Sequence, residues 1–159
     1  MTDIAGDPVI VGNRVYIGNF GGRSVALNLA DGSRIWTAPE GAVSPIWPVG
    51  NAVFLINDIN ELVRLDAGTG LPVWRVSLPT FEGGERTRNQ SSIFTHFGPI
   101  LAGGRLIVTS SDGVIREFDP TSGAQIGTID LPGGAASGPV VADQTLYVLG
   151  KTGQLHAFR

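Results

Sequence analysis

The chain of 159 residues contains no cysteine, one lysine and two histidines, His96 and His156. The missing cysteine excludes disulfides, thiolate metal ligands and a cysteine nucleophile within these residues. Charged residues make up 16% of the chain, the net charge is −3 and the ten arginines are scattered singly, so neither a nucleic-acid groove nor a basic membrane patch is expected. No apolar run reaches the length of a membrane-spanning helix, and the first residues show no signal-peptide pattern.

Glycine and proline are abundant instead, with 23 and 10 residues, and short apolar segments lie between them. This composition favours short strands joined by tight turns. Four segments resemble one another, each with a preceding proline, a turn and an apolar strand; their turns lie at Gly12, Gly50, Gly103 and Asp143. A repeat of about 40 residues that contains only strands and turns is typical of β-propeller blades.

We therefore predict an all-β fold, a β-propeller fragment of about four blades in one domain over residues 1–159. The expected repeats cover residues 7–40, 44–79, 97–132 and 137–159. The expected strands of the second repeat are residues 45–49, 52–57, 61–66 and 72–77. The first three repeats hold four strands each and the last holds three, so the last blade lacks its outer strand. Propellers typically have about four to eight blades, and we expect the chain to be the C-terminal half of a longer protein.

Three repeats share a turn in which a polar residue is followed four positions later by glycine, and two of them continue to a tryptophan. These residues are Asn28, Gly32 and Trp36; Asp66, Gly70 and Trp74; and Asp119 and Gly123. An Asp or Asn side chain accepts hydrogen bonds from N–H groups of its own turn, and glycine adopts the positive φ that closes it. We interpret the turn residues as structural rather than calcium-binding, and the tryptophans as packing against the next blade. The third repeat has Gly127 in place of the tryptophan.

No catalytic, cofactor-binding or metal-binding residues are expected. His96 lies at a strand entrance without an evident serine or acidic partner in a triad arrangement. His156 occupies a strand position that Val25, Val63 and Arg116 hold in the other repeats, which favours a role on the strand surface.

The inserted loop, residues 80–95, is the candidate for function, because long loops in compact domains often carry binding residues. In an up-and-down blade it emerges on the same face as the loops between second and third strands. We predict that four of its residues contact a protein partner: Phe81, Arg86, Arg88 and Phe94. The alternative is a solvated loop whose phenylalanines pack on the rim of the blades.

The run Leu65-Asp66-Ala67-Gly68-Thr69-Gly70-Leu71-Pro72-Val73-Trp74, with a weaker copy at residues 27–36, resembles the repeat of PQQ-like β-propellers. Within that superfamily, residues 98–108 and 153–159 resemble the C-terminal part of the BamB family, lipoproteins of the outer-membrane β-barrel assembly (BAM) machinery.

The resemblance implies a periplasmic, outer-membrane-associated scaffold that is not an enzyme, holds no cofactor and binds BamA, with the remaining blades supplied by its own full-length chain. Two alternatives stay open. One is a fragment of a PQQ-dependent quinoprotein dehydrogenase, although the absence of cysteine argues against the alcohol dehydrogenases with a vicinal disulfide. The other is a propeller interaction module unrelated to barrel assembly.

Overall fold

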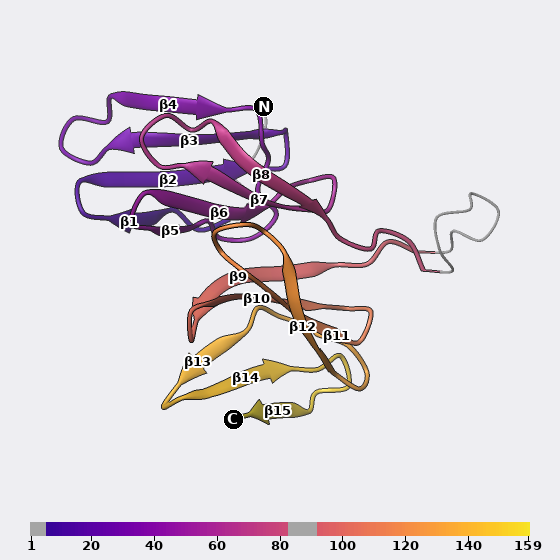
Figure 1. Cartoon of the computed structure of the whole chain (residues 1–159). Coiled ribbons are helices and arrows are strands. Elements are labelled where there is room, and N and C mark those ends of the chain that lie inside the picture. Colours follow the sequence, from indigo (N-terminus) through magenta and orange to yellow (C-terminus); the bar gives the residue numbers. More distant parts are fainter. Residues whose placement is uncertain (1–5, 83–91) are drawn as a thin grey trace. The chain divides into compact units, whose positions relative to one another are not determined.

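The computed structural model describes residues 6–82 and 92–159 (Figure 1). All the regular secondary structure assigned in these two segments is β-strand. No helix in these two segments is long and apolar enough to cross a membrane. The strands are β1 (Val9–Val11), β2 (Arg14–Asn19), β3 (Arg23–Asn28), β4 (Arg34–Ala38), β5 (Trp47–Val49), β6 (Ala52–Ile56), β7 (Glu61–Asp66), β8 (Pro72–Ser77), β9 (His96–Ala102), β10 (Arg105–Ser110), β11 (Val114–Phe118), β12 (Gln125–Asp130), β13 (Val140–Ala142), β14 (Thr145–Leu149) and β15 (Leu155–Phe158).

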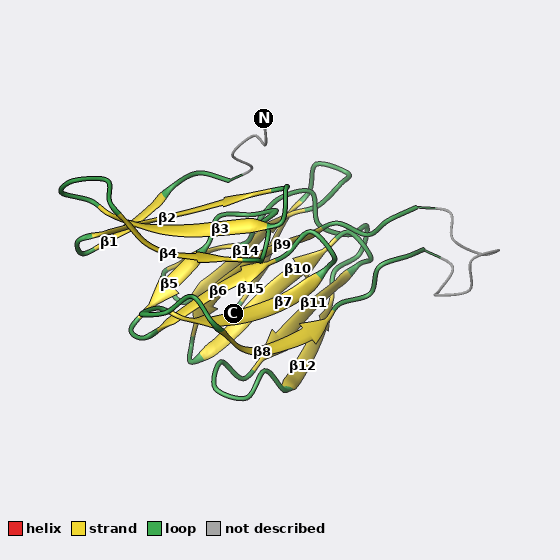
Figure 2. Ribbon diagram, turned by 90° about the horizontal axis from the view of Figure 1, so that it is seen from above, coloured by secondary structure: helices red, strands yellow, loops and turns green. Residues whose placement is uncertain are grey.

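The strands form four antiparallel sheets, each built from strands that follow one another in the chain (Figure 2). The orders are β1-β2-β3-β4, β5-β6-β7-β8, β9-β10-β11-β12 and β13-β14-β15, which we call blades 1 to 4. The predicted all-β class, with three four-stranded blades and a three-stranded last blade, is confirmed. In blade 2, the predicted strand bounds lie within two residues of the observed bounds.

The chain divides into two compact units. Unit 1, residues 1–77, contains blades 1 and 2, and unit 2, residues 78–159, contains blades 3 and 4. In unit 1, every residue of β6 is buried. A strand covered on both faces has no solvent side, so its sequence is a continuous apolar run rather than an alternation. This is why Ala52-Val53-Phe54-Leu55-Ile56 carries no polar residue.

The turn between β7 and β8 is held by the side chain of Asp66. Its Oδ1 accepts hydrogen bonds from the N–H groups of Gly68 at 3.0 Å and Thr69 at 2.8 Å, and from Thr69 Oγ1 at 2.9 Å. The Thr69 hydrogen bonds favour the ionised carboxylate and lower the pKa of Asp66. Gly70 closes the turn with a φ of 72°, and its N–H donates to the Asp66 carbonyl at 2.8 Å.

The same turn occurs in blades 1 and 3. Asp119 Oδ1 accepts a hydrogen bond from the N–H of Ser122 at 2.7 Å, which lowers the pKa of Asp119, and Gly123 has a φ of 76°. In blade 1, Asn28 takes the place of the aspartate and accepts a hydrogen bond from a turn N–H at 2.9 Å, while Gly32 has a φ of 70°. The polar residue and the glycine therefore have the same local functions in all three turns.

Trp36 on β4 joins blade 1 to blade 2. Its indole Nε1 donates a hydrogen bond to the carbonyl of Ala67 in the β7–β8 turn at 2.9 Å, and its ring centroid lies 6.0 Å from that of Tyr16. Arg14 donates a second hydrogen bond to the same carbonyl. A Cβ atom at Gly70 would lie 2.7 Å from the indole carbons. Glycine is therefore required there both by its positive φ and by the close approach of the indole.

The interior of unit 2 is built differently. In blade 1, Trp36 of β4 pairs with Ala26 of β3. At the equivalent position of blade 3, Gly127 of β12 pairs with Glu117 of β11, so blade 3 has no side chain where blade 1 has an indole. One buried cluster of unit 2 consists of Ile107, Ile115, Leu131, Ala135, Leu146 and Val148, and Phe118 is fully buried as well. Trp74, which shares the repeat position, packs against Phe54 within blade 2, with ring centroids 5.9 Å apart.

Candidate functional site

One end of each unit gathers the loops between second and third strands together with the connector between blades. In unit 1, the connector N–H groups of Ala42 and Val43 donate to the carbonyls of Asn19 and Ile56, each at 3.1 Å. In unit 2, the connector N–H groups of Ala135 and Ala136 donate to the last residues of β10 and β14, at 2.9 and 2.8 Å. This is the arrangement expected from an up-and-down blade. We call this end of each unit the loop face.

The loop face of unit 1 is held by Glu40, whose side chain is 6% exposed. The Glu40 carboxylate accepts hydrogen bonds from Asn57 Nδ2 at 3.1 Å and from Arg75 Nε at 3.2 Å, and Arg75 Nη2 forms an ion pair with it. The Glu40 carbonyl accepts from Ser24 Oγ at 2.8 Å. A buried carboxylate needs such partners, because an unpaired buried charge is costly. The network fixes the connector of unit 1 to both of its blades.

At the loop face of unit 2, the base of the inserted loop consists of two antiparallel segments, residues 80–82 and 92–94, which Figure 1 draws as coil. We call these two segments the ribbon. Phe81 forms a β-bridge with Ile93, and the N–H of Phe94 donates to the carbonyl of Thr80 at 2.9 Å. Phe81 and Phe94 are half-buried, whereas Ile93 is 65% exposed. The ribbon therefore presents an apolar side chain to solvent next to two aromatic residues.

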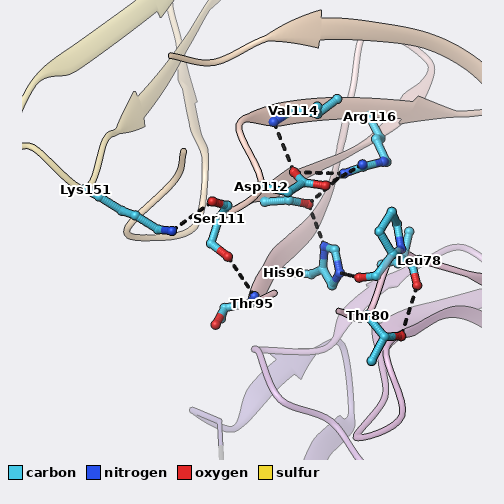
Figure 3. A network of polar contacts seen from close by, with 11 residues as sticks. Leu78, Thr80, Thr95, His96, Ser111, Asp112, Val114, Arg116 and Lys151 are labelled. Carbon is cyan, nitrogen blue, oxygen red and sulfur yellow. Dashed lines mark hydrogen bonds and ion pairs between the residues drawn. The ribbon is translucent and has the colours of Figure 1, made fainter. Parts of the chain in front are cut away.

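The ribbon is anchored to blade 3 at both of its ends. The imidazole Nε2 of His96 lies 2.7 Å from the carbonyl of Pro79. The N–H of Thr95 donates to Ser111 Oγ at 2.9 Å, and the N–H of Ser111 donates to the Thr95 carbonyl at 2.9 Å. Lys151 Nζ, from the loop between β14 and β15, donates to the Ser111 carbonyl at 2.8 Å (Figure 3). These bonds hold both ends of the insertion in place.

The hydrogen bonds around His96 fit a neutral imidazole. The Pro79 carbonyl only accepts, so Nε2 carries the proton, and Nδ1, 2.6 Å from Ser110 Oγ, can accept from that hydroxyl. Ser110 Oγ in turn accepts from Arg116 Nη1 at 3.1 Å, and Arg116 Nη2 forms a 2.5 Å ion pair with Asp112 (Figure 3). Burial is the main cause of the lowered pKa of His96, since it disfavours the charged ring.

This His–Ser contact does not have the properties of a catalytic pair. Ser110 is fully buried and His96 is 1% exposed, so neither atom of the contact is open to a substrate. The second ring nitrogen is engaged by a backbone carbonyl, and the nearby carboxylate of Asp112 pairs with Arg116 rather than with the imidazole. The arrangement positions the loop. Within residues 6–82 and 92–159 there is also no group of three or more His, Asp or Glu that could hold a metal ion.

The structure places the four predicted partner-contact residues unequally. Phe81 and Phe94 lie in the ribbon, one on each of its two segments, while Arg86 and Arg88 lie outside the described residues. Sequence reasoning missed Ile93, although it is the most exposed apolar residue of the ribbon.

Sequence reasoning also missed the serine beside His96: the antiparallel pairing of β9 and β10 sets Ser110 opposite His96. The available signal was Arg116, which occupies a position held by valine in blades 1 and 2. A buried arginine at a valine position requires polar partners nearby. His156 lies on β15, half-buried and stacked on Phe158 with ring centroids 6.4 Å apart.

The repeated four-stranded sheets, their Asp-to-Gly turns and the tryptophan contact between blades define a β-propeller built from PQQ-like repeats. The family model described as outer membrane protein assembly factor BamB matches residues 1–76 and 111–159, and the chain belongs to this family.

BamB of Shewanella oneidensis is 27% identical over 156 residues, which are 98% of this chain and 36% of that protein. BamB of Escherichia coli is 23% identical over 160 residues, 99% of this chain and 37% of that protein. The chain thus spans just over a third of the length of these curated relatives.

Solved structures show the same fold. The crystal structure of BamB from Moraxella catarrhalis has a TM-score of 0.76 at 24% identity, with 98% of this chain and 46% of that chain covered. A quinohemoprotein alcohol dehydrogenase from Comamonas testosteroni has a TM-score of 0.71 at 16% identity, with 92% and 29% covered. The fold therefore occurs both in BamB and in quinoprotein dehydrogenases.

Proposed function

We propose that this chain is part of a BamB-type scaffold that binds a protein partner and catalyses no reaction. The proposed partner is BamA of the BAM complex, and the proposed location is the periplasm, in association with the outer membrane. The observation that carries the proposal is the match of the BamB family model to residues 1–76 and 111–159. The curated relatives from Shewanella and Escherichia bear the name outer membrane protein assembly factor.

The ribbon at the base of the inserted loop is the proposed contact surface. Tryptophan, tyrosine and arginine are enriched among the residues that dominate binding energy at protein interfaces, and phenylalanine is also enriched in interface cores. Phe81, Phe94 and the exposed Ile93 supply the apolar part, and Arg86 and Arg88 are proposed to supply the charged part. The anchored base supports this assignment, since a surface that is ordered before binding loses less entropy on association.

The test is capture of the full-length protein by immobilised BamA periplasmic region. We expect the double substitution of Arg86 and Arg88 by alanine, and separately Ile93→Ala, to weaken capture by about tenfold or more, as loss of interface anchors does. Arg34→Ala is the matched control, because Arg34 is an exposed arginine at the first position of β4 and lies outside the inserted loop. Unchanged capture by all loop variants would refute the loop as the contact surface, and no capture of the natural protein would refute BamA as the partner.

A quinoprotein dehydrogenase is the second candidate, because the Comamonas enzyme shares the fold at a TM-score of 0.71. Pyrroloquinoline quinone and Ca²⁺ added to the full-length protein separate the two candidates. Saturable quinone binding together with dye-linked turnover would contradict the scaffold proposal. The scaffold proposal expects neither, and expects capture by BamA to be unchanged by the quinone.

A further inference from the structure

Unit 1 contains a cavity of about 420 Å³ between blade 1 and blade 2. Its walls come from the end of β1, the first half of β2, and the β5–β6 and β7–β8 turns. These turns join first to second and third to fourth strands, so they lie at the end of unit 1 away from its loop face. The cavity is thus separate from the Glu40 network, and its volume lies within the range of small-molecule sites.

Arg14 and Tyr16 reach this cavity from the same face of β2. Side chains two positions apart on a strand lie on one face of the sheet, and both residues line the cavity. Tyr16 pairs with Ala26 and Ala26 with Trp36, so this is the face whose indole meets the β7–β8 turn of blade 2. Arg14 Nη1 donates a hydrogen bond to the Ala67 carbonyl of that turn. The guanidinium is therefore held at the boundary between the two blades.

The positive charge of Arg14 has no negative partner in the protein segments that the structure describes. Ion pairs within residues 6–82 and 92–159 involve other arginines. None of the described residues that line the cavity is acidic, and Asp66, in the neighbouring turn, accepts its hydrogen bonds from Gly68 and Thr69. A guanidinium carries five N–H donors, of which the Ala67 carbonyl takes one. Because Arg14 is half-buried, an anion in the cavity would compensate a partly desolvated charge.

Two neutral donors lie beside this charge. Tyr16 is 4% exposed, yet its hydroxyl forms no hydrogen bond within the described residues and is not a buried atom. Since Tyr16 lines the cavity, the hydroxyl opens into it. Asn51 lines the cavity from the β5–β6 turn and is exposed, so its side-chain amide is also free to donate. Val11, 47% exposed, adds an apolar surface.

We infer that this cavity binds the carboxylate of a ligand that also carries a short apolar group. The guanidinium edge formed by Nε and Nη2 of Arg14 matches a carboxylate with two parallel hydrogen bonds. The Tyr16 hydroxyl and the Asn51 amide donate to the remaining lone pairs, and the apolar group packs on Val11. One guanidinium balances a single negative charge, so a monocarboxylate is favoured over a phosphate dianion. This inference is independent of the scaffold function.

The test is a titration of the full chain with isovalerate at neutral pH, followed through the Nε–Hε resonance of Arg14. We expect saturable shifts. The neutral isostere isovaleramide is expected to bind weaker by about tenfold or more, because it loses hydrogen bonds between charged groups. Inorganic phosphate is expected to bind more weakly than isovalerate. N-acetyl-leucine separates the sources: its binding indicates that the C-terminal carboxylate of a polypeptide enters, and binding of isovalerate alone indicates a small free acid.

Two variants remove donors from the cavity. Arg14→Gln removes the charge, and we expect isovalerate affinity to fall by about tenfold or more. Tyr16→Phe removes only the hydroxyl and keeps the ring that packs on Trp36, so a fall of roughly three- to tenfold is expected. Arg23→Gln is the matched control, since Arg23 is an exposed arginine at the first position of β3, next to the loop face, and its loss should leave binding unchanged.

Circular dichroism confirms that each variant is folded. If Arg14→Gln fails to fold, Arg14→Lys keeps the charge and a donor for Ala67 but lacks the planar fork, and it is expected to bind isovalerate several-fold more weakly. Absence of saturation in the natural chain, equal affinity for isovaleramide, or undiminished binding in the folded Arg14 variants would overturn the inference. Tighter binding of phosphate than of isovalerate would overturn the choice of a monocarboxylate, and undiminished binding in Tyr16→Phe would overturn the role of Tyr16.

Discussion

Acidification below neutral pH is expected to destabilise unit 2 through His96. The folded chain holds this imidazole neutral, because burial lowers its pKa by more than the Pro79 carbonyl and Asp112 raise it; the charge of Arg116 makes a smaller contribution that also lowers the pKa. In the unfolded chain the imidazole has its ordinary pKa of 6.5. Between these two pKa values the unfolded chain binds one more proton than the folded chain. The free energy of unfolding must therefore fall as the pH falls through this range.

The size of the effect follows from the proton count. One proton of difference changes the free energy of unfolding by up to about 1.4 kcal/mol per pH unit. The loss begins near pH 6.5, the ordinary pKa of the imidazole, and stops below the lowered pKa of the folded chain. The hydrogen bond to the Pro79 carbonyl opposes the lowering of this pKa, because it favours the charged ring.

Urea unfolding of the full chain between neutral pH and about pH 5 measures the effect, with His96→Gln as the comparison. Carboxylates such as Asp66 and Asp119 also titrate on the acid side, but they are the same in both proteins and cancel in the difference. We expect the natural chain to lose stability with a steeper pH slope than His96→Gln. Equal slopes in the two proteins would refute the proposed neutral, buried state of His96.

Three further predictions concern unit 1. Trp36→Ala should lower the free energy of unfolding by about 3–5 kcal/mol, measured in urea, because it removes a buried ring between two blades. Gly70→Ala should lower the unfolding temperature measured by calorimetry, because both the φ of 72° and the nearby indole exclude a Cβ atom. The control Leu71→Ala, at the adjacent exposed residue, should change the unfolding temperature little. Glu40→Gln should lower the free energy of unfolding by about 1 kcal/mol and lessen its dependence on salt concentration. The loss is modest because the Arg75 side chain is 42% exposed. An unchanged salt dependence would contradict this reasoning.

The sequence predicted the parts of the fold that depend on neighbouring residues. The strands of blade 2 follow from a continuous apolar run and two turns, and the turn at Asp66 follows from the spacing to Gly70. Each of these signals lies within about ten residues. The packing of a strand against the next one in the chain needs only such local information.

The contacts of the candidate site were not predictable in the same way. Glu40 and Arg75 are 35 residues apart, and His96 and Ser110 are 14 apart. Each pair meets only because particular strands and connectors lie side by side, which single-sequence patterns do not specify.

The contact of Trp36 with the β7–β8 turn has a consequence for how such proteins grow. The indole belongs to one repeat, and the carbonyl and glycine that receive it belong to the next. A gene segment that encodes a single repeat thus encodes one half of each of two junctions. Duplication of that segment adds a blade whose junctions with both neighbours are already specified, so the length of the array can change in evolution without new contacts having to arise.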